Sequence, residues 1–218
     1  MQRCAVLPDR LAAHHTAYIP FMDSRRPRQT SVHGLLTMCS NARAGIAEKV
    51  QKPDELVQLV NNQNVVVGTA PRRQMRAENL LHRCSFVLVY NGKGQLYVQK
   101  RVAFKETYPS FYDPAPGGVV GAGESYEESA MREIEEEMGV TGVALKPHLD
   151  FYYEDAVTRM FGRLFSCVYN GTIRLDPEEV ESGCFLDKPD VEELLRTEKV
   201  CPDSKMALER FYAEQATL

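Results

Sequence analysis

Three glutamates in the middle of the chain have a spacing that would let them act together. Glu133, Glu136 and Glu137 stand at positions i, i+3 and i+4 within the segment GVVGAGESYEESAMREIEEEMGV. Because an α-helix turns by about 100° per residue, a helix from about Glu124 to Met138 would carry all three on one arc. Their like charges repel one another, more strongly as the site loses water. We therefore expect them to hold a hard divalent cation, Mg²⁺ or Mn²⁺, which prefers carboxylate ligands.

The neighbours of this acidic stripe favour a binding site over the usual alternative, a solvated acidic helix face. The adjoining arc of the same helix is apolar, so the stripe lies at the margin of the buried face. That arc consists of Ala130, Met131, Ile134 and Met138. Gly117 and Gly118 allow the backbone to turn sharply into the helix, and Gly139 can end it in a left-handed conformation. Arg132 is placed to hold a carboxylate such as Glu124 from the preceding loop.

The segment resembles the Nudix box, G-x5-E-x7-R-E-U-x-E-E-x-G-U, in which U is aliphatic. Every fixed position of that pattern is matched, by Gly118, Glu124, Arg132, Glu133, Ile134, Glu136, Glu137, Gly139 and Val140. Similarity to the Nudix hydrolase family extends over about residues 55–215. It implies an α/β fold, an α/β/α sandwich around a mixed β-sheet, in which the box forms a loop, a helix and a second loop.

The resemblance also implies an activity and roles for the box residues. Nudix enzymes typically hydrolyse a diphosphate bond in a nucleoside diphosphate linked to another group, and they use divalent cations. By resemblance Glu136 and Glu137 are the direct metal ligands, and Glu133 is a ligand or the general base. The residues of the box with a structural role would be Gly118, Glu124, Arg132 and Gly139. The bound metal would neutralise phosphate oxygens, lower the pKa of a water and align that water for attack on phosphorus.

Two further groups of residues have candidate roles. A general base outside the box is an alternative to Glu133, and surface charge is the competing interpretation for each candidate. These candidates are Glu154, Asp155, Glu178 and Glu179. A diphosphate beside a carboxylate-rich metal site also needs cations on its far side. The candidates for substrate binding are Lys100, Arg101 and Lys105, with plain solvation at a strand end as the alternative.

The hydrophobic pattern predicts strands mixed with helices, without the regular alternation of a doubly wound sheet. A short helix is expected at PDELVQLV, where Asp54 and Glu55 suit a helix N-terminus. Two strands joined by a turn at Asn91 to Gly94 are expected to form a hairpin. The predicted strands are 64–69, 82–91, 95–102, 145–155, 159–171 and 183–188, and two further helices are expected at 191–198 and 204–215.

Composition divides the chain of 218 residues into two parts. The first 47 residues hold six Arg, no Lys, only two acids and no sustained apolar period. We therefore expect a flexible basic tail over 1–50 and a Nudix hydrolase domain over 51–218. A transit peptide is one interpretation of the tail, and an inert extension or a start codon misassigned upstream of Met22 or Met38 is another. Cytoplasmic and mitochondrial or plastid locations both stay open.

The charge balance also limits the partners. A net charge of −4 argues against binding nucleic acid through bulk charge, and no apolar run is long enough for a membrane helix. The expected partner is a small-molecule diphosphate substrate, with no nucleic acid and no membrane, while a homodimer stays open. Six cysteines far apart in the chain, without metal-ligand spacing, are expected to be reduced and mostly buried thiols.

Longer segments resemble one branch of the family, the bacterial Nudix hydrolases related to isopentenyl-diphosphate isomerase. They are GTAPRRQM, LLHRCSFVLVYNGKGQLYVQKRVAFKETYPSFYDP and CPDSKMALERF. The catalytic cysteine and a metal histidine of the isomerases fall at Gly117 and Val119 here, and another metal histidine falls near Met75, which leaves only His82. Hydrolysis is therefore favoured, and the alternatives are an isomerase-like enzyme acting on prenyl diphosphates and a non-catalytic nucleotide-binding module.

Overall fold

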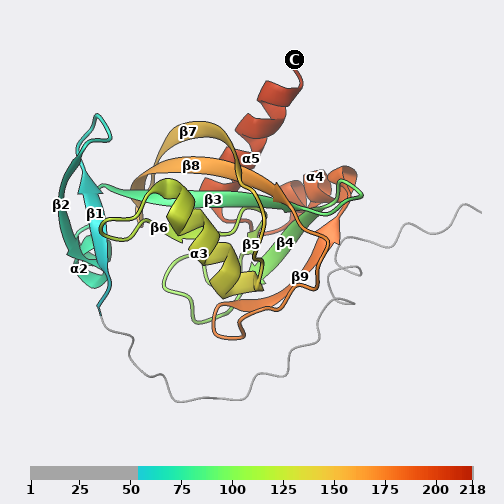
Figure 1. Cartoon of the computed structure of the whole chain (residues 1–218), viewed down its shortest axis with the longest axis horizontal. Helices are drawn as coiled ribbons and strands as arrows, with labels where there is room; N and C mark the ends of the chain where they lie inside the picture. The colour runs from blue at the N-terminus through green and yellow to red at the C-terminus, as the bar shows by residue number, and fades with distance from the viewer. Residues whose placement is uncertain (1–53, 218) are drawn as a thin grey trace, which may run out of the picture.

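The structure is a computed structural model that describes residues 54–217. The predicted tail, residues 1–50, therefore lies outside the described residues, and with it the question of a transit peptide. The described strands pair into one mixed sheet (Figure 1). They are β1 (Leu56–Val60), β2 (Val66–Pro71), β3 (His82–Tyr90), β4 (Leu96–Arg101), β5 (Tyr112–Asp113), β6 (Gly117–Val119), β7 (Lys146–Glu154), β8 (Arg159–Val168) and β9 (Val180–Leu186).

Strand β3 is the centre of the sheet. One of its edges pairs in parallel with β8 along its whole length, from His82 opposite Met160 to Tyr90 opposite Val168. Its other edge is shared by three antiparallel partners, namely β1, β6 and β4. A strand with neighbours on both edges and helices on both faces needs mostly apolar residues, and the second half of the run HRCSFVLVY supplies them.

Helices cover both faces of this sheet, so the layers are those of the predicted α/β/α sandwich. Alternate residues of β3 point to opposite faces, so Phe86 and Leu88 belong to one core cluster while Val87 and Val89 belong to the other. The second cluster includes apolar residues of α3 (Tyr126–Met138). The first includes residues of α4 (Lys188–Thr197) and α5 (Pro202–Gln215), which lie behind the sheet in Figure 1.

Two local predictions were wrong, and a third is confirmed only over a short stretch. The segment PDELVQLV forms strand β1 and not a helix, because it pairs with β2 along its length. The polar stretch after β2 forms a short helix, α2 (Arg72–Ala77), where none was expected. Strands β3 and β4 are joined by the predicted turn and pair antiparallel, but only at Tyr90 and Leu96, because β6 pairs with the rest of this edge of β3 and β5 pairs with β4.

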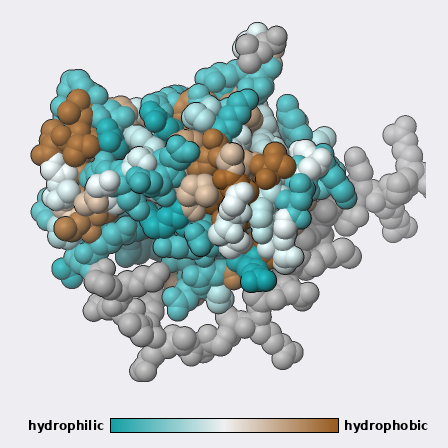
Figure 2. All heavy atoms as spheres, in the orientation of Figure 1, coloured by the Kyte–Doolittle hydropathy of each residue, from teal (hydrophilic) through white to brown (hydrophobic). Residues whose placement is uncertain are grey.

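Two surface properties bear on partners. The described residues include no helix long and apolar enough to cross a membrane. Figure 2 shows an apolar patch over the edge of the sheet formed by β1 and β2. Leu56, Val65, Val66 and Val67 in this region are between 45% and 64% exposed. The homodimer considered above stays a prediction.

Candidate active site

Helix α3 carries the acidic stripe, and its two ends are fixed by its own sequence. Ser125 is the N-cap: its side chain accepts a hydrogen bond from the Glu128 backbone, and the Glu128 carboxylate accepts one from the Ser125 backbone. This reciprocal capping box starts the helix at Tyr126, two residues later than expected. Gly139 ends it with φ of 65°, the left-handed conformation that the sequence predicted there.

The two glycines before α3 lie in strand β6, and their role differs from the predicted one. Neither has a positive φ, so they do not provide a sharp turn into the helix. Instead they allow close approach: a Cβ on Gly118 would lie 2.0 Å from Oε1 of Glu133, and one on Gly117 would lie 1.9 Å from the Ser85 carbonyl oxygen. Gly118 thus leaves the space into which the Glu133 carboxylate packs.

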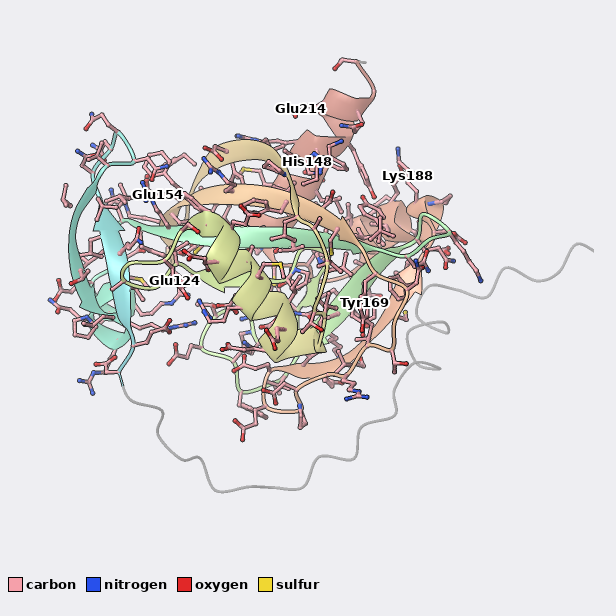
Figure 3. All side chains as sticks on the ribbon, in the orientation of Figure 1. Glu124, His148, Glu154, Tyr169, Lys188 and Glu214 are labelled. Carbon is pink, nitrogen blue, oxygen red and sulfur yellow. The ribbon has the colours of Figure 1, made fainter. Side chains whose placement is uncertain are left out.

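Arg132 braces the loop between β6 and α3. Its Nε donates to Oε1 of Glu124 over 2.8 Å and its Nη2 donates to Oε2 over 3.0 Å, a two-pronged contact of the kind its spacing indicated. The Gly121 backbone donates to the same carboxylate over 2.8 Å. These hydrogen bonds, led by the one from Arg132, lower the pKa of Glu124. In Figure 3 Glu124 lies beside β1, whose Gln58 side chain donates to the Glu124 carbonyl oxygen.

The three glutamates of the stripe divide into a buried pair and an exposed member. Glu133 and Glu137 are only 8% and 4% exposed, whereas the side chain of Glu136 is 55% exposed. Arg132 donates to Glu133 over 2.8 Å, and Gln99 of β4 donates to Glu137 over 2.7 Å. Burial, together with the charge of Glu137, raises the pKa of Glu133. Two buried carboxylates one helical turn apart need positive charge between them.

Of the three predicted substrate cations, only Lys105 contacts the stripe. Its ammonium lies 3.3 Å from Oε1 of Glu137 and also contacts the Glu179 carboxylate. Arg101 is buried, 3.7 Å from Asp113, and also donates to the Thr107 carbonyl oxygen. Lys100 pairs with Glu181 at 3.0 Å, away from the stripe.

The four candidate bases are also separated. Glu179 lies beside the stripe through its contact with Lys105. Asp155 accepts hydrogen bonds from the hydroxyls of Tyr108 and Tyr153 at the turn between β7 and β8. The other two have no contact with the box among the described residues: Glu154 pairs with Arg159 over 3.3 Å, and Glu178 is exposed.

Three residues bear on the predicted resemblance to the isomerases, and none of them is placed to bind a metal. Met75 is packed in the core at 1% exposure, and Val119 is fully buried in β6. His82 is also fully buried, with Nδ1 2.8 Å from the Leu80 carbonyl oxygen, so Nδ1 must carry the proton. Burial lowers the pKa of His82 to about 4, so the imidazole is neutral.

The residues of the stripe suit a hard divalent cation by their chemistry. Glu133, Glu136 and Glu137 offer only oxygen donors, which Mg²⁺ and Mn²⁺ prefer. Within residues 54–217, no three His, Cys, Asp or Glu side chains converge as a ready-made cage. The Arg132 guanidinium and the Lys105 ammonium contact the carboxylates instead. The site therefore already attracts positive charge at the place where a metal would sit.

Gln99 is a site residue that the sequence analysis missed. It is fully buried, its Nε2 donates to Glu137, and its Oε1 has no partner among the described residues. The signal was a glutamine that directly follows the buried run Leu96, Tyr97 and Val98 in the strand LYVQKR. A buried amide is costly unless it is hydrogen-bonded, so this one is best explained by the carboxylate that it orients.

Comparisons with known proteins agree with this arrangement. The NUDIX domain model matches residues 80–208. The uncharacterized Nudix hydrolase YfcD of Escherichia coli (strain K12) is 42% identical over 154 residues, which cover 71% of this chain and 84% of that protein. An uncharacterized Nudix hydrolase of Pseudomonas aeruginosa is 36% identical over 169 residues, or 78% of this chain and 99% of that protein. The crystal structure of DR0079 from Deinococcus radiodurans superposes with a TM-score of 0.61 at 25% identity, covering 72% of this chain and 98% of that one. A matched box on a matched fold has one explanation: this chain belongs to the Nudix hydrolase family.

Proposed function

We propose that this chain is a divalent-metal-dependent diphosphohydrolase. It cleaves a diphosphate bond in a nucleoside-diphosphate-linked or other organic diphosphate by attack of water on phosphorus. The observation that carries the proposal is the pair of buried carboxylates, Glu133 and Glu137, on helix α3. Glu133 packs against Gly118 of β6, and Glu136 lies beside the pair on the same helix. Such a costly arrangement is useful when a cation and a phosphate complete it.

The residues of the chain have distinct roles in this proposal. Glu133, Glu136 and Glu137 would hold Mg²⁺ or Mn²⁺, which would neutralise phosphate oxygens and lower the pKa of a water. Gln99 fixes the rotamer of Glu137, and Arg132 fixes that of Glu133. Glu179, across Lys105 from Glu137, is the candidate base outside the box. Lys105 moves from the carboxylates to the substrate phosphates when both cation and substrate bind.

The resemblance to isopentenyl-diphosphate isomerase is the reason to include prenyl diphosphates among the substrates to test. The buried Met75 and the neutral, fully buried His82 support hydrolysis over isomerisation, because neither can take part in a histidine-rich metal site. Cys84, which pairs with Val119 of β6, is buried, which raises the pKa of its thiol to about 12 and keeps it from acting as a nucleophile.

Phosphorus NMR of a substrate panel in ¹⁸O-labelled water tests the function. The panel contains nucleotide sugars, NADH, ADP-ribose, dinucleoside polyphosphates, CoA and prenyl diphosphates, each with Mg²⁺. At least one compound is expected to release a phosphate or monophosphate whose ³¹P signal shows the isotope shift of one new ¹⁸O. A rearranged product without phosphate release would point to the isomerase, and binding without any product would point to the nucleotide-binding module.

The Glu136→Gln variant links the activity to the site. It is expected to lower turnover by orders of magnitude while leaving the fold intact, because Glu136 is exposed and contributes little to packing. Glu135→Gln is the matched control, since Glu135 is an exposed residue of the same helix that lies outside the stripe. Turnover of the Glu136 variant at the parent rate would remove this residue from the metal site.

A further inference from the structure

Arg76, on helix α2, is a partly buried cation that forms no ion pair with an acid among residues 54–217. Its Nε is buried and has no hydrogen-bond partner among the described residues. Three other arginines of the domain differ, because each of them has a carboxylate partner. These pairs are Arg72 with Glu55 at 3.0 Å, Arg101 with Asp113 at 3.7 Å and Arg132 with Glu124 at 2.8 Å. Withdrawing a guanidinium from water without such a partner costs free energy, and arginine does not escape the cost by losing its proton.

The packing around α2 keeps Arg76 in this position. The residue before Arg76, Met75, is only 1% exposed and belongs to the core cluster that also contains Cys84 of β3. Helix α2 packs against β1 and β2, and Val57 of β1 bridges to Gly121 in the loop that enters α3. Arg76 is therefore fixed on the side of the domain where the loop of the box begins.

Electrostatic interactions connect Arg76 with the acidic stripe. The charges of Arg76, Arg72 and Glu133 all act on the Cys84 thiol, so all three lie within electrostatic range of this residue of β3. Arg72 also acts directly on Glu133. Cys84 pairs with Val119, whose neighbour Gly118 makes room for the Glu133 carboxylate. Positive charge from α2 and negative charge from α3 thus meet across β3 and β6.

The remaining charges near Arg76 leave room for an anion. Glu106 and Asp203 act on Arg76 at longer range, and neither forms an ion pair with it. Burial raises the pKa of Asp203 to about 7, so this carboxyl is partly protonated near neutral pH and repels an anion less. The side-on face of a guanidinium, Nε with one Nη, matches two oxygens of a phosphate.

We infer that Arg76 binds one of the two phosphates of the substrate, namely the phosphate that is not held at the carboxylate site. This inference rests on the proposed function and specifies it: the substrate is a diphosphate whose second phosphate is gripped by the α2 arginine. The cations that sequence patterns favoured for this role, Lys100 and Arg101, are already paired with acids.

Calorimetric titration of the metal-free protein with inorganic pyrophosphate in EDTA tests the inference without metal or turnover. The parent protein is expected to bind pyrophosphate, and Arg76→Gln is expected to weaken the binding by about 10- to 100-fold, the value of a hydrogen-bonded charge. Arg76→Lys should recover part of the loss. The control is Arg73→Gln, which removes the same charge from the same helix, at a side chain 85% exposed and paired with Asp54.

Thermal unfolding separates this role from a structural one. Arg76 forms no ion pair among the described residues, and glutamine keeps part of its packed stem, so Arg76→Gln should melt near the parent temperature. A lowered melting temperature together with unchanged pyrophosphate binding would overturn the inference. Equal weakening by the Arg73 and Arg76 variants, or no binding by the parent, would also overturn it. Binding that depends on Arg76 in a protein that hydrolyses nothing would support this inference and reject the proposed function.

Discussion

The Glu133 carboxylate depends on the absence of a side chain at Gly118. It packs into the space that a Cβ would fill, and Arg132 holds it there. The sequence predicted that both Gly117 and Gly118 are needed, but it predicted a turn. Only the structure shows a close approach, because the atoms that approach come from β3 and α3, which the linear pattern cannot bring together.

Alanine substitutions at the two glycines should have different effects. Gly117→Ala puts a Cβ against the Ser85 carbonyl oxygen, and because a backbone cannot move aside we expect the free energy of unfolding to fall by about 1–3 kcal/mol or more. Gly118→Ala meets only the far end of Glu133, so the fold should survive while the displaced carboxylate lowers hydrolysis. Urea denaturation and a rate assay measure both effects.

Gly68→Ala is the control for this pair, because nothing lies within 4 Å of a Cβ there. It should leave both the stability and the rate near the parent values. A Gly118→Ala protein with full hydrolytic activity would show that Glu133 need not occupy its observed position.

His82 should make the stability of the domain depend on pH. Its pKa is about 4 in the folded protein against 6.5 for the free side chain, because burial disfavours the charged form. The unfolded chain therefore binds more protons between these values, and the His82 contribution is lost as pH falls from about 6.5 to about 4. The loss should approach about 3 kcal/mol, at 1.36 kcal/mol per pKa unit.

Unfolding free energies of the parent and His82→Gln, measured between pH 4 and 7, isolate this effect because the other titrating groups are common to both proteins. As pH falls, the unfolding free energy of the parent should decrease more than that of His82→Gln. His148→Gln replaces a half-buried histidine in a less perturbed environment, so it should alter the pH dependence of the unfolding free energy less. Parallel curves for the parent and the His82 variant would show that His82 titrates normally in the fold.

The secondary structure elements could be predicted from the sequence where a local signal determined them. Helix α3 has a capping box, a left-handed glycine and an apolar arc, and its predicted end at Met138 was correct. Strand β1 was taken for a helix because Asp54 and Glu55 suit a helix N-terminus. In the structure these acids pair with Arg73 and Arg72 of α2, at 3.3 Å and 3.0 Å. These two acids therefore form ion pairs that hold the start of β1 against helix α2.

The capping box of α3 should contribute to stability and little to catalysis. Ser125→Ala removes the hydroxyl that accepts from the Glu128 backbone, and an N-cap of this kind is worth about 1 kcal/mol. A double-mutant cycle with Glu128→Ala should show coupling, because the two side chains cap each other. Urea denaturation measures the free energies.

Glu127→Ala is the control for this cycle, since Glu127 is an exposed acid of the same first turn that takes no part in the capping box. It should change stability less than Glu128→Ala. Additive effects of the Ser125 and Glu128 substitutions would contradict reciprocal capping.

The assembly of the site depends on pairings between distant parts of the chain. Strand β9 pairs with β4, and the Val102 backbone donates to the Glu179 carbonyl oxygen over 3.3 Å, which puts Glu179 beside Lys105. No local pattern distinguishes Glu179 from Glu178, since both follow the same proline. The family pattern therefore predicted the fold and the box, whereas the residues that surround the box required the full topology.

Titration of the protein with Mn²⁺, followed by the loss of the free-ion EPR signal, tests most directly whether the stripe is a metal site. We expect binding by the parent and by Glu135→Gln, and binding at least about 10-fold weaker in Glu137→Gln, because that variant removes a buried charge from the proposed ligands. Equal Mn²⁺ affinity in the parent and in Glu137→Gln would show that the stripe does not bind the metal through Glu137.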